Sequence, residues 1–199
     1  MSTKYLNIDN ISCIQYYSKF IEDIDTNMCE IIKNEVTFLS DEKSAIFIMG
    51  KKVNIPRKQC AYGDAGTNYT FSGISVKGNT WEDAPNLKKI KDIIHKKLNI
   101  PVNYVLVNLY EDGNEYIGWH SDDEKDIDQN HPIVSLSFGS ERSFLLRDKR
   151  TKDTYEKVLE NNSCILMKPP CQKLYKHSLP KRKKVKLPRI NLTFRVIKT

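Results

Sequence analysis

The chain has 199 residues, of which 39% are hydrophobic and 29% charged, and it carries a formal net charge of +7. A chain of this length can bury a substantial core and is expected to form a single domain. It has no apolar run near the roughly 18 residues that span a bilayer and no secretory pattern at its start, so no membrane partner is expected. The five cysteines never occur as Cys-x-x-Cys, which argues against a disulfide framework or a zinc site. They favour an intracellular, reducing compartment, either the nucleus or the cytoplasm.

The positive charge is concentrated near the C-terminal end. After Glu160 there is no acidic residue, and residues 161–199 contain 11 lysines and arginines. A basic segment on an otherwise slightly acidic body fits a polyanionic partner, and the alternative is a solvated charged face. The run Lys181-Arg-Lys-Lys184 also matches the pattern of a nuclear localisation signal, which is common by chance.

Two amphipathic helices are predicted in the first half of the chain. The first covers residues 24–36, with Thr26 or Asn27 near its N-terminal cap. The second covers residues 85–98, begins with a proline and carries apolar side chains at helical spacing, namely Leu87, Ile90, Ile94 and Leu98. The first fifty residues are expected to wrap around the outside of the fold. Between the helices, glycines 63, 66 and 73 indicate a loop-rich stretch.

From residue 103 onward the pattern changes to short strands. They are separated by Gly, Pro, Asp and Asn turns and are expected at 105–107, 133–138, 143–146, 164–167 and 190–197. Short strands without long helices between them argue against a parallel βαβ sheet. The expected fold class is therefore α+β but mainly β, with an antiparallel sandwich or jelly roll.

His120 and Asp122 are the first candidates for a metal site. They stand at positions i and i+2, so on an extended segment both side chains point to the same face. Two histidines and one carboxylate form the facial triad that binds ferrous iron and leaves positions open for substrate and oxygen. His177 is the candidate third ligand, because His95 lies on a predicted helix and His131 in a polar turn. A His-x-Asp motif alone arises often by chance.

The segment 189–196 alternates between polar and apolar side chains. Its polar face has no acidic residue or lysine and consists of Arg189, Asn191, Thr193 and Arg195. The two arginines lie about 20 Å apart on an extended strand, and by leaning inward they could hold both ends of a five-carbon diacid. Asn108 and Tyr110 could add polar contacts. The alternative is an edge strand with a solvated face. Together with the candidate triad, this face suggests an oxygenase that uses iron and 2-oxoglutarate.

The sequence resembles the AlkB dioxygenases, most of all their duplex-DNA repair branch, the AlkB homologue two type. The resemblance runs from about Ile55 to the C-terminus. Its signatures are Asn108-Leu-Tyr110, His120-Ser-Asp122-Asp-Glu124, Ser135-Leu-Ser-Phe-Gly139, Tyr175-Lys-His177-Ser and Arg189-Ile-Asn-Leu-Thr-Phe-Arg195. The nucleotide-recognition part of that branch is matched by Pro56-Arg-Lys-Gln59, Tyr62-Gly-Asp-Ala-Gly66 and Tyr69-Thr-Phe-Ser-Gly73.

The resemblance implies a double-stranded β-helix, or jelly roll, with N-terminal helices and a nucleotide-recognition lid. The single domain 1–199 would comprise an N-terminal extension at 1–54, the nucleotide-recognition region with its supporting helix at 55–102, and the catalytic core at 103–199. Fe(II) would be bound by His120, Asp122 and His177. The cosubstrate 2-oxoglutarate, used together with O2, would be bound by Asn108, Tyr110, Arg189, Thr193 and Arg195.

The resemblance further implies that a flipped, methylated base is recognised by Tyr69, Phe71, Asp123 and Glu124, with Arg57 in the neighbouring recognition segment. An extruded base needs an aromatic face and polar groups at its edge. A base methylated on a ring nitrogen carries positive charge, which nearby carboxylates favour. Without the resemblance, such aromatics are more often minor core residues, and the carboxylates resemble a solvated acidic turn.

The sequence departs from the family at one segment. The duplex-repair branch inserts a bulky aromatic side chain into the gap that the flipped base leaves. Here the matching segment is Ile48-Met49-Gly50-Lys51, which makes Met49, Gly50 and Lys51 candidate substrate contacts. Methionine can act as an apolar wedge between base steps, but it is more flexible than a phenyl ring. The preference between duplex and single-stranded substrate is therefore left open.

The predicted function is oxidative demethylation of N-alkylated bases in DNA, of the N1-methyladenine and N3-methylcytosine type. This direct-reversal repair would couple decarboxylation of 2-oxoglutarate to succinate and CO2 with release of the methyl group as formaldehyde. The chain is expected to be a monomer with nucleic acid as its partner. RNA is the alternative substrate for the same chemistry. Hydroxylation of a protein side chain, or a binding module without catalysis, are further alternatives.

Overall fold

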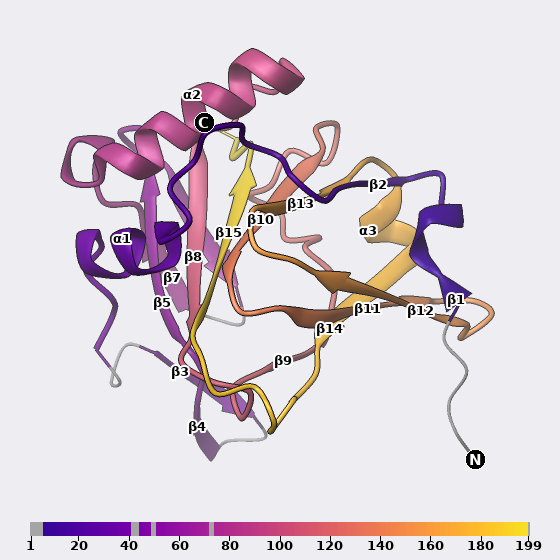
Figure 1. Ribbon diagram of the computed structural model, residues 1–199. Coiled ribbons are helices and arrows are strands. Elements are labelled where there is room, and N and C mark those ends of the chain that lie inside the picture. Colours follow the sequence, from indigo (N-terminus) through magenta and orange to yellow (C-terminus); the bar gives the residue numbers. More distant parts are fainter. Residues whose placement is uncertain (1–5, 41–43, 49–50, 72–73, 199) are drawn as a thin grey trace.

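The computed structural model describes residues 6–40, 44–48, 51–71 and 74–198. Two β-sheets face each other, and two helices cover the outer face of the larger sheet (Figure 1). The prediction of a mainly β, antiparallel jelly roll is confirmed. Met49 and Gly50 lie outside the described residues.

The larger sheet has six strands in the order β2–β13–β10–β15–β8–β5, all antiparallel to their neighbours. Its strands are β2 (Ile14–Tyr17), β5 (Lys58–Gly63), β8 (Tyr104–Tyr110), β10 (Ile133–Gly139), β13 (Ser163–Met167) and β15 (Arg189–Arg195). Strand β15 lies in the middle of this sheet, between β10 and β8. The interpretation of this segment as an edge strand is therefore excluded.

The smaller sheet has five strands in the order β1–β12–β11–β14–β9. They are β1 (Leu6–Asn7), β9 (Ile117–His120), β11 (Arg142–Asp148), β12 (Thr154–Leu159) and β14 (Tyr175–Leu179). Strands β12 and β14 were not predicted, because their polar side chains give no clear alternation. Instead, pairing with β11 on both sides keeps them extended.

Helix α2 (Pro85–Leu98) has the predicted bounds and ends where Asn99 adopts a left-handed conformation. Its apolar side chains Leu87, Ile90 and Ile94 are buried against the outer face of the larger sheet, where they belong to one hydrophobic core. Burial of each such side chain contributes about 1.5–3 kcal/mol to folding. Helix α1 (Met28–Glu35) is shorter than predicted, because the residues before Met28 form turns, and its N-cap Asn27 makes no side-chain capping bond.

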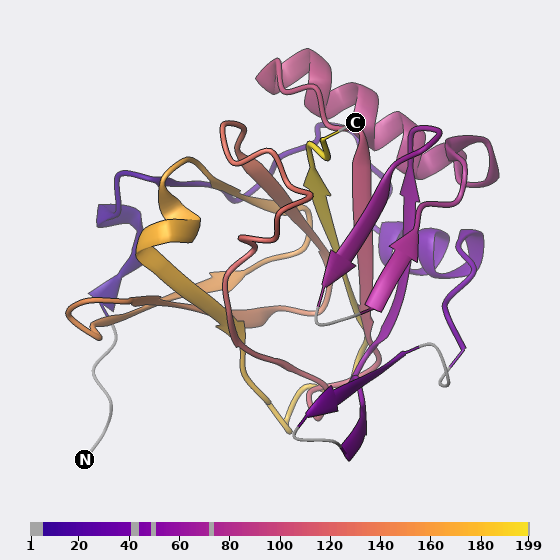
Figure 2. The same cartoon turned by 180° about the vertical axis from the view of Figure 1, so that it is seen from behind.

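The expectation of a loop-rich stretch around glycines 63, 66 and 73 is wrong. Strand β5 ends at Gly63, and a hairpin follows, made of β6 (Asn68–Phe71) and β7 (Ile74–Lys77). Aromatic and β-branched residues favour strands, so Gly63 and Gly66 mark only the short connection between β5 and β6. A second hairpin consists of β3 (Ala45–Ile48) and β4 (Lys51–Asn54). Seen from behind, β6–β7 lies beside the segment that follows β9 (Figure 2), where the Thr70 amide donates to the Asp126 carboxylate at 2.9 Å.

The N-terminal residues are part of both sheets. Strand β1 pairs with β12 and β2 pairs with β13, so each forms the edge of one sheet. The short helices η1 (Ile8–Asn10), η2 (Trp81–Asp83) and α3 (Cys171–Leu174) complete the described elements. Within the described residues, no helix combines the length and the apolar character that crossing a bilayer requires.

Candidate active site

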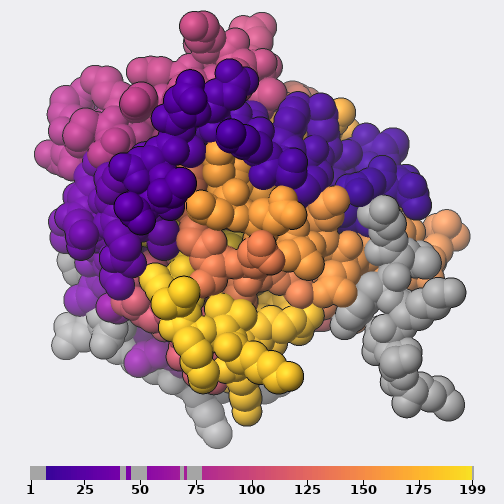
Figure 3. Space-filling model, viewed as in Figure 1, coloured from indigo at the N-terminus to yellow at the C-terminus, as the bar shows by residue number. Residues whose placement is uncertain are grey.

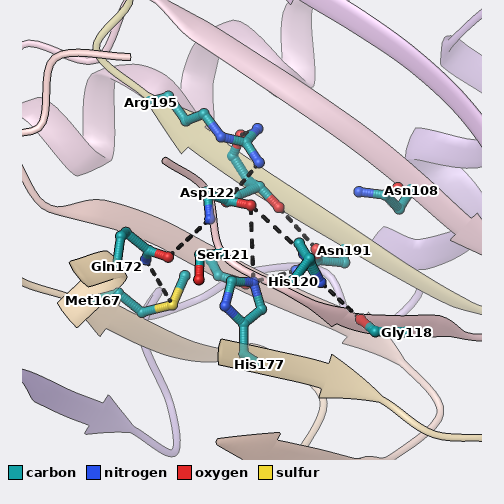
Figure 4. Close-up of polar contacts among 12 residues, drawn as sticks. Asn108, Gly118, His120, Ser121, Asp122, Met167, Gln172, His177, Asn191 and Arg195 are labelled. Atoms are coloured by element: carbon teal, nitrogen blue, oxygen red, sulfur yellow. Dashed lines mark hydrogen bonds and ion pairs between the residues drawn. The ribbon is translucent and has the colours of Figure 1, made fainter. Parts of the chain in front are cut away.

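Pairing between β9 and β14 assembles the candidate metal site between the two sheets. His177 lies directly opposite His120 in this antiparallel pair, with ring centroids 4.1 Å apart. Asp122 follows two residues after His120, and its Oδ1 lies 3.6 Å from His120 Nε2 and 3.9 Å from His177 Nε2. The ligand atoms of the three residues all lie within 4.8 Å of one another. Figure 4 shows the three side chains converging on one point.

Hydrogen bonds hold Asp122 at its carboxylate and at its backbone amide. Arg195 Nη2 donates to Asp122 Oδ2 at 2.7 Å, which leaves Oδ1 directed toward the two histidines. The Asp122 amide donates to Gln172 Oε1 at 2.9 Å, and Gln172 lies on the short helix α3 (Figure 4). His120 Nδ1 lies 2.9 Å from the Gly118 carbonyl, a contact that directs Nε2 to the metal position.

Burial and charge set the protonation of the triad. Burial alone would raise the pKa of Asp122, but Arg195 and the two histidines hold it well below its usual range. Burial, together with the neighbouring His120, lowers the pKa of His177 to about 3. The pKa of His120 is also lowered, mainly by burial. At neutral pH the site therefore holds two neutral imidazoles and one carboxylate, which is the state that binds a divalent metal.

The triad opens into a cavity of about 470 Å³. Besides the three metal-ligand candidates, its lining includes all five predicted 2-oxoglutarate contacts, Asn108, Tyr110, Arg189, Thr193 and Arg195. This volume is typical of sites for small ligands. The polar face of β15 therefore points inward, and its apolar residues Ile190, Leu192 and Phe194 pack into the opposite core.

The surroundings of Arg189 fit a bound anion. Its side chain is buried, Nη2 donates to Ser137 Oγ at 2.8 Å, and the guanidinium lies 5.4 Å from the Tyr110 ring. Its Nε donates to no acceptor, and no carboxylate of the described residues pairs with it. Burial lowers the pKa of Arg189 to about 10, so it remains charged. A buried, unpaired cation is costly, and a carboxylate of 2-oxoglutarate would satisfy it.

Asn108 is positioned by two residues of the neighbouring segment. Its Oδ1 accepts from Arg57 Nε at 2.7 Å and from Gln59 Nε2 at 2.8 Å. The amide nitrogen is therefore left to donate into the cavity, and Figure 4 shows it on the side that faces the triad. A neutral donor here and the cationic Arg189 suit the two ends of a polar diacid. The residues present thus fit both Fe(II) and 2-oxoglutarate.

The predicted base-recognition residues are not all brought together. Glu124 and Arg57 line the cavity, close to the triad. Asp123 is exposed, lies 3.7 Å from Lys149 and does not line the cavity. Tyr69 and Phe71 lie on β6 and Lys51 on β4, but their side chains are outside the described part of the structure, as are Met49 and Gly50. The roles of these residues stay predictions.

Sequence reasoning missed several residues that shape the site. Gln172 carries no motif, and its contact with Asp122 depends on the position of α3. Arg142 is buried and donates to three backbone carbonyls, those of Asp112, Glu115 and Pro180. Its guanidinium lies 5.6 Å from the Tyr110 ring, on which Arg189 also packs. Of the residues missed, only Ser135 and Ser137 could have been found from the sequence. They stand at positions i and i+2 of β10, and alternate residues of a strand share a face.

Comparison with known proteins agrees with this geometry. A family model described as the 2OG-Fe(II) oxygenase superfamily matches residues 23–195. The chain is 36% identical to the DNA oxidative demethylase ALKBH2 of Mus musculus, over 98% of this chain and 83% of that protein. It is also 36% identical to ALKBH2 of Homo sapiens, over 98% of this chain and 77% of that protein.

Two further similarities are more distant. The human alkB homolog 3, an alpha-ketoglutarate-dependent dioxygenase, is 34% identical over 71% of this chain and 52% of that protein. The solved structure of OsALKBH1 superposes with a TM-score of 0.59 at 17% identity, covering 96% of this chain and 100% of that one. This likeness concerns the fold alone. The chain belongs to the 2OG-Fe(II) oxygenase superfamily and is an AlkB-type oxidative demethylase that depends on Fe(II) and 2-oxoglutarate.

Proposed function

We propose that this protein removes methyl groups from N-methylated bases in nucleic acid, of the N1-methyladenine and N3-methylcytosine type, with DNA as the preferred substrate. The observation that carries the proposal is the single cavity that combines the triad, the unpaired Arg189 and the carboxylate of Glu124. The Glu124 carboxylate, which lines the same cavity as the triad, favours a positively charged methylated base over a neutral one. The 36% identity to proteins named DNA oxidative demethylase supports DNA over other substrates.

The chain's own residues divide the work of this reaction. When bound, Fe(II) and 2-oxoglutarate would supply, together with O2, the oxidant that converts the methyl group to a hydroxymethyl group, with release of succinate and CO2. His120, Asp122 and His177 hold the metal, and Arg189 and Asn108 orient the diacid. Apolar side chains of the cavity wall, Ile117, Phe144, Leu159 and Met167, exclude water from the reacting methyl group.

The final step needs no further catalyst. The hydroxymethyl group loses its hydroxyl proton to water as the carbon–nitrogen bond breaks, and the bonding electron pair passes to the ring nitrogen. Formaldehyde leaves and the base becomes neutral. The loss of positive charge weakens the attraction to Glu124, which favours release of the repaired base.

Mass spectrometry of a short oligonucleotide with one N1-methyladenine tests the proposal. The protein is incubated with Fe(II), ascorbate and 2-oxoglutarate, and controls omit 2-oxoglutarate or use His177→Ala. Loss of one methylene mass only in the complete reaction is the expected result. Succinate formation without demethylation of any methylated DNA or RNA would contradict the proposed substrate while leaving the oxygenase intact.

Matched DNA and RNA oligonucleotides in competition decide between the two nucleic acids. The preference for duplex is tested separately with Met49→Phe, which restores an aromatic side chain at the proposed wedge position. We expect the rate on duplex relative to single strand to rise in this variant, because a phenyl ring stacks better than a thioether. An unchanged ratio would contradict insertion at this position.

A further inference from the structure

Two aromatic side chains beside β9 are each covered by a cation. Lys181 Nζ lies 4.8 Å from the centre of the Tyr116 ring, and the Arg147 guanidinium lies 4.0 Å from the centre of the Trp119 ring. Arg147 is held in place by a hydrogen bond to Thr154 Oγ1 at 3.2 Å. Both aromatics line the active-site cavity and remain partly exposed, so they lie at its rim.

Packing does not account for these two rings. Ile117, which lies between them at the start of β9, packs against the hydrophobic core between the sheets. Among the described residues, neither Tyr116 nor Trp119 belongs to a hydrophobic cluster. An aromatic ring that is paired with a cation at a cavity rim, and is not used by the core, is typical of a surface that binds bases and phosphates.

The basic segment 181–186 continues this surface. Backbone hydrogen bonds join it to the turn before Tyr116, from Arg182 N to Gly113 O at 2.7 Å and from Gly113 N to Val185 O at 3.0 Å. The two segments approach so closely that a Cβ at Gly113 would overlap the Arg182 carbonyl. This contact fixes the basic segment next to the rim. In Figure 3 the yellow C-terminal part of the chain forms a projecting patch on the molecular surface.

Several lysines of this segment form no ion pair with the described residues. Among the described residues, no carboxylate pairs with Lys181, Lys183, Lys184 or Lys186, whereas Arg182 is paired with Glu156 at 3.2 Å. The rim therefore presents unneutralised cations beside two aromatic rings, and it borders the cavity in which the target base is proposed to react. A polyanion with exposed flat bases has the complementary chemistry.

We propose that Tyr116, Trp119 and Arg147, with Lys181, bind the unpaired nucleotides that flank the target base, which makes single-stranded nucleic acid the favoured substrate class. The inference rests on the proposed function. Stacking on Trp119 or on the Arg147 guanidinium requires a base whose face is free. In a duplex the flanking bases are stacked on their neighbours, so they gain less from this rim.

Binding of unmodified oligonucleotides tests the surface without any turnover. The protein is loaded with Mn(II) and 2-oxoglutarate, and the affinity for a fluorescein-labelled single strand and for the matching duplex is measured by anisotropy. We expect Trp119→Ala to weaken single-strand binding roughly five- to tenfold, with a smaller loss for the duplex. Arg147→Ala is expected to weaken single-strand binding as well. Lys157→Ala is the matched control, because Lys157 also lies over an aromatic ring, 4.1 Å from the centre of Tyr16, but that ring does not line the cavity.

Intrinsic fluorescence gives an independent readout. The chain has two tryptophans, and Trp81 is buried in the core with its ring stacked on Phe194. Quenching by an unlabelled single strand therefore reports Trp119, and Trp119→Phe is expected to abolish the quenching while retaining most of the affinity. Equal single-strand affinity of the parent and Trp119→Ala would overturn the proposed surface. It would leave the demethylase proposal standing, since that proposal is tested by loss of the methyl group.

Discussion

Arg195 donates a 2.7 Å hydrogen bond to Asp122, so an arginine predicted to bind the cosubstrate is paired with a candidate metal ligand. Both side chains are buried. Removing one partner of a buried ion pair is strongly destabilising, because it leaves the other charge uncompensated. The metal position and the cosubstrate position are therefore coupled through one guanidinium.

This coupling predicts a double effect of Arg195→Ala. Loss of a residue that orients a metal ligand typically lowers metal affinity by about 10- to 100-fold. We expect the half-saturating concentration of Fe(II) to rise by this order, in addition to a weaker affinity for 2-oxoglutarate. Titration of succinate formation with each component measures the two effects. A change in the 2-oxoglutarate dependence alone would contradict the coupling.

Arg189→Met is expected to separate cosubstrate binding from stability. Because Arg189 has no carboxylate partner, its replacement should raise the KM for 2-oxoglutarate at least about tenfold and remove the ligand's stabilising effect on thermal unfolding. The free protein itself should unfold at an unchanged or higher temperature, since a buried unpaired charge is lost.

Arg142→Met is the matched control, because both arginines pack on Tyr110. Arg142 donates to three partly buried backbone carbonyls, and loss of each bond costs up to about 1–3 kcal/mol. This variant should therefore be clearly destabilised. Equal unfolding temperatures of the two variants without 2-oxoglutarate would contradict the different roles assigned to them.

Metal binding should persist at mildly acidic pH. An ordinary histidine gains a proton below about pH 6.5 and then competes with the metal. The pKa of His177, lowered by burial to about 3, keeps its ring neutral as the pH falls from 7 to 5. Burial also lowers the pKa of His120, so its ring gains a proton at a lower pH than an ordinary histidine does. Calorimetric titration with Mn(II) at several pH values should therefore show a smaller loss of affinity over this range than two histidines of ordinary pKa would give. A loss of about tenfold per pH unit below 6.5 would indicate histidines of ordinary pKa.

Gln172→Leu is expected to weaken metal binding, although Gln172 is not one of the candidate metal ligands. The substitution leaves the buried Asp122 amide without its acceptor, so the position of the carboxylate is no longer fixed. We expect about a tenfold loss of Mn(II) affinity. Lys173→Ala, at the next and exposed position of α3, should retain parental affinity. Equal affinities of the two variants would show that Gln172 has only a packing role.

The basic segment 181–186 predicts a steep salt dependence of nucleic-acid binding. Affinity for duplex DNA should fall by about 0.9 log units per log unit of salt for each phosphate contacted. Lys183→Ala or Lys184→Ala should each reduce this slope by about the amount that one phosphate contact contributes. Lys96, which is exposed on α2, provides the control, and Lys96→Ala should leave the slope unchanged. A flat salt response of the parent would identify the segment as solvated surface.

The sequence by itself determined the chemistry of the site. Alternation with a period of two placed Arg189, Asn191, Thr193 and Arg195 on one face, and the i, i+2 spacing of His120 and Asp122 predicted two ligands from one segment. Both patterns are local, because successive side chains of a strand point to opposite faces whatever the strand pairs with. Helix α2 was equally clear, since its apolar stripe repeats over several turns.

Only the tertiary structure decided which of these groups meet. That His177 faces His120 depends on the pairing of β14 with β9, and that Arg195 reaches Asp122 depends on the approach of the two sheets. Neither relation has a local signal, because strand order and sheet packing are set by contacts between residues distant in the chain. The same holds for Gln172 under Asp122, and for the cations over Tyr116 and Trp119 at the cavity rim.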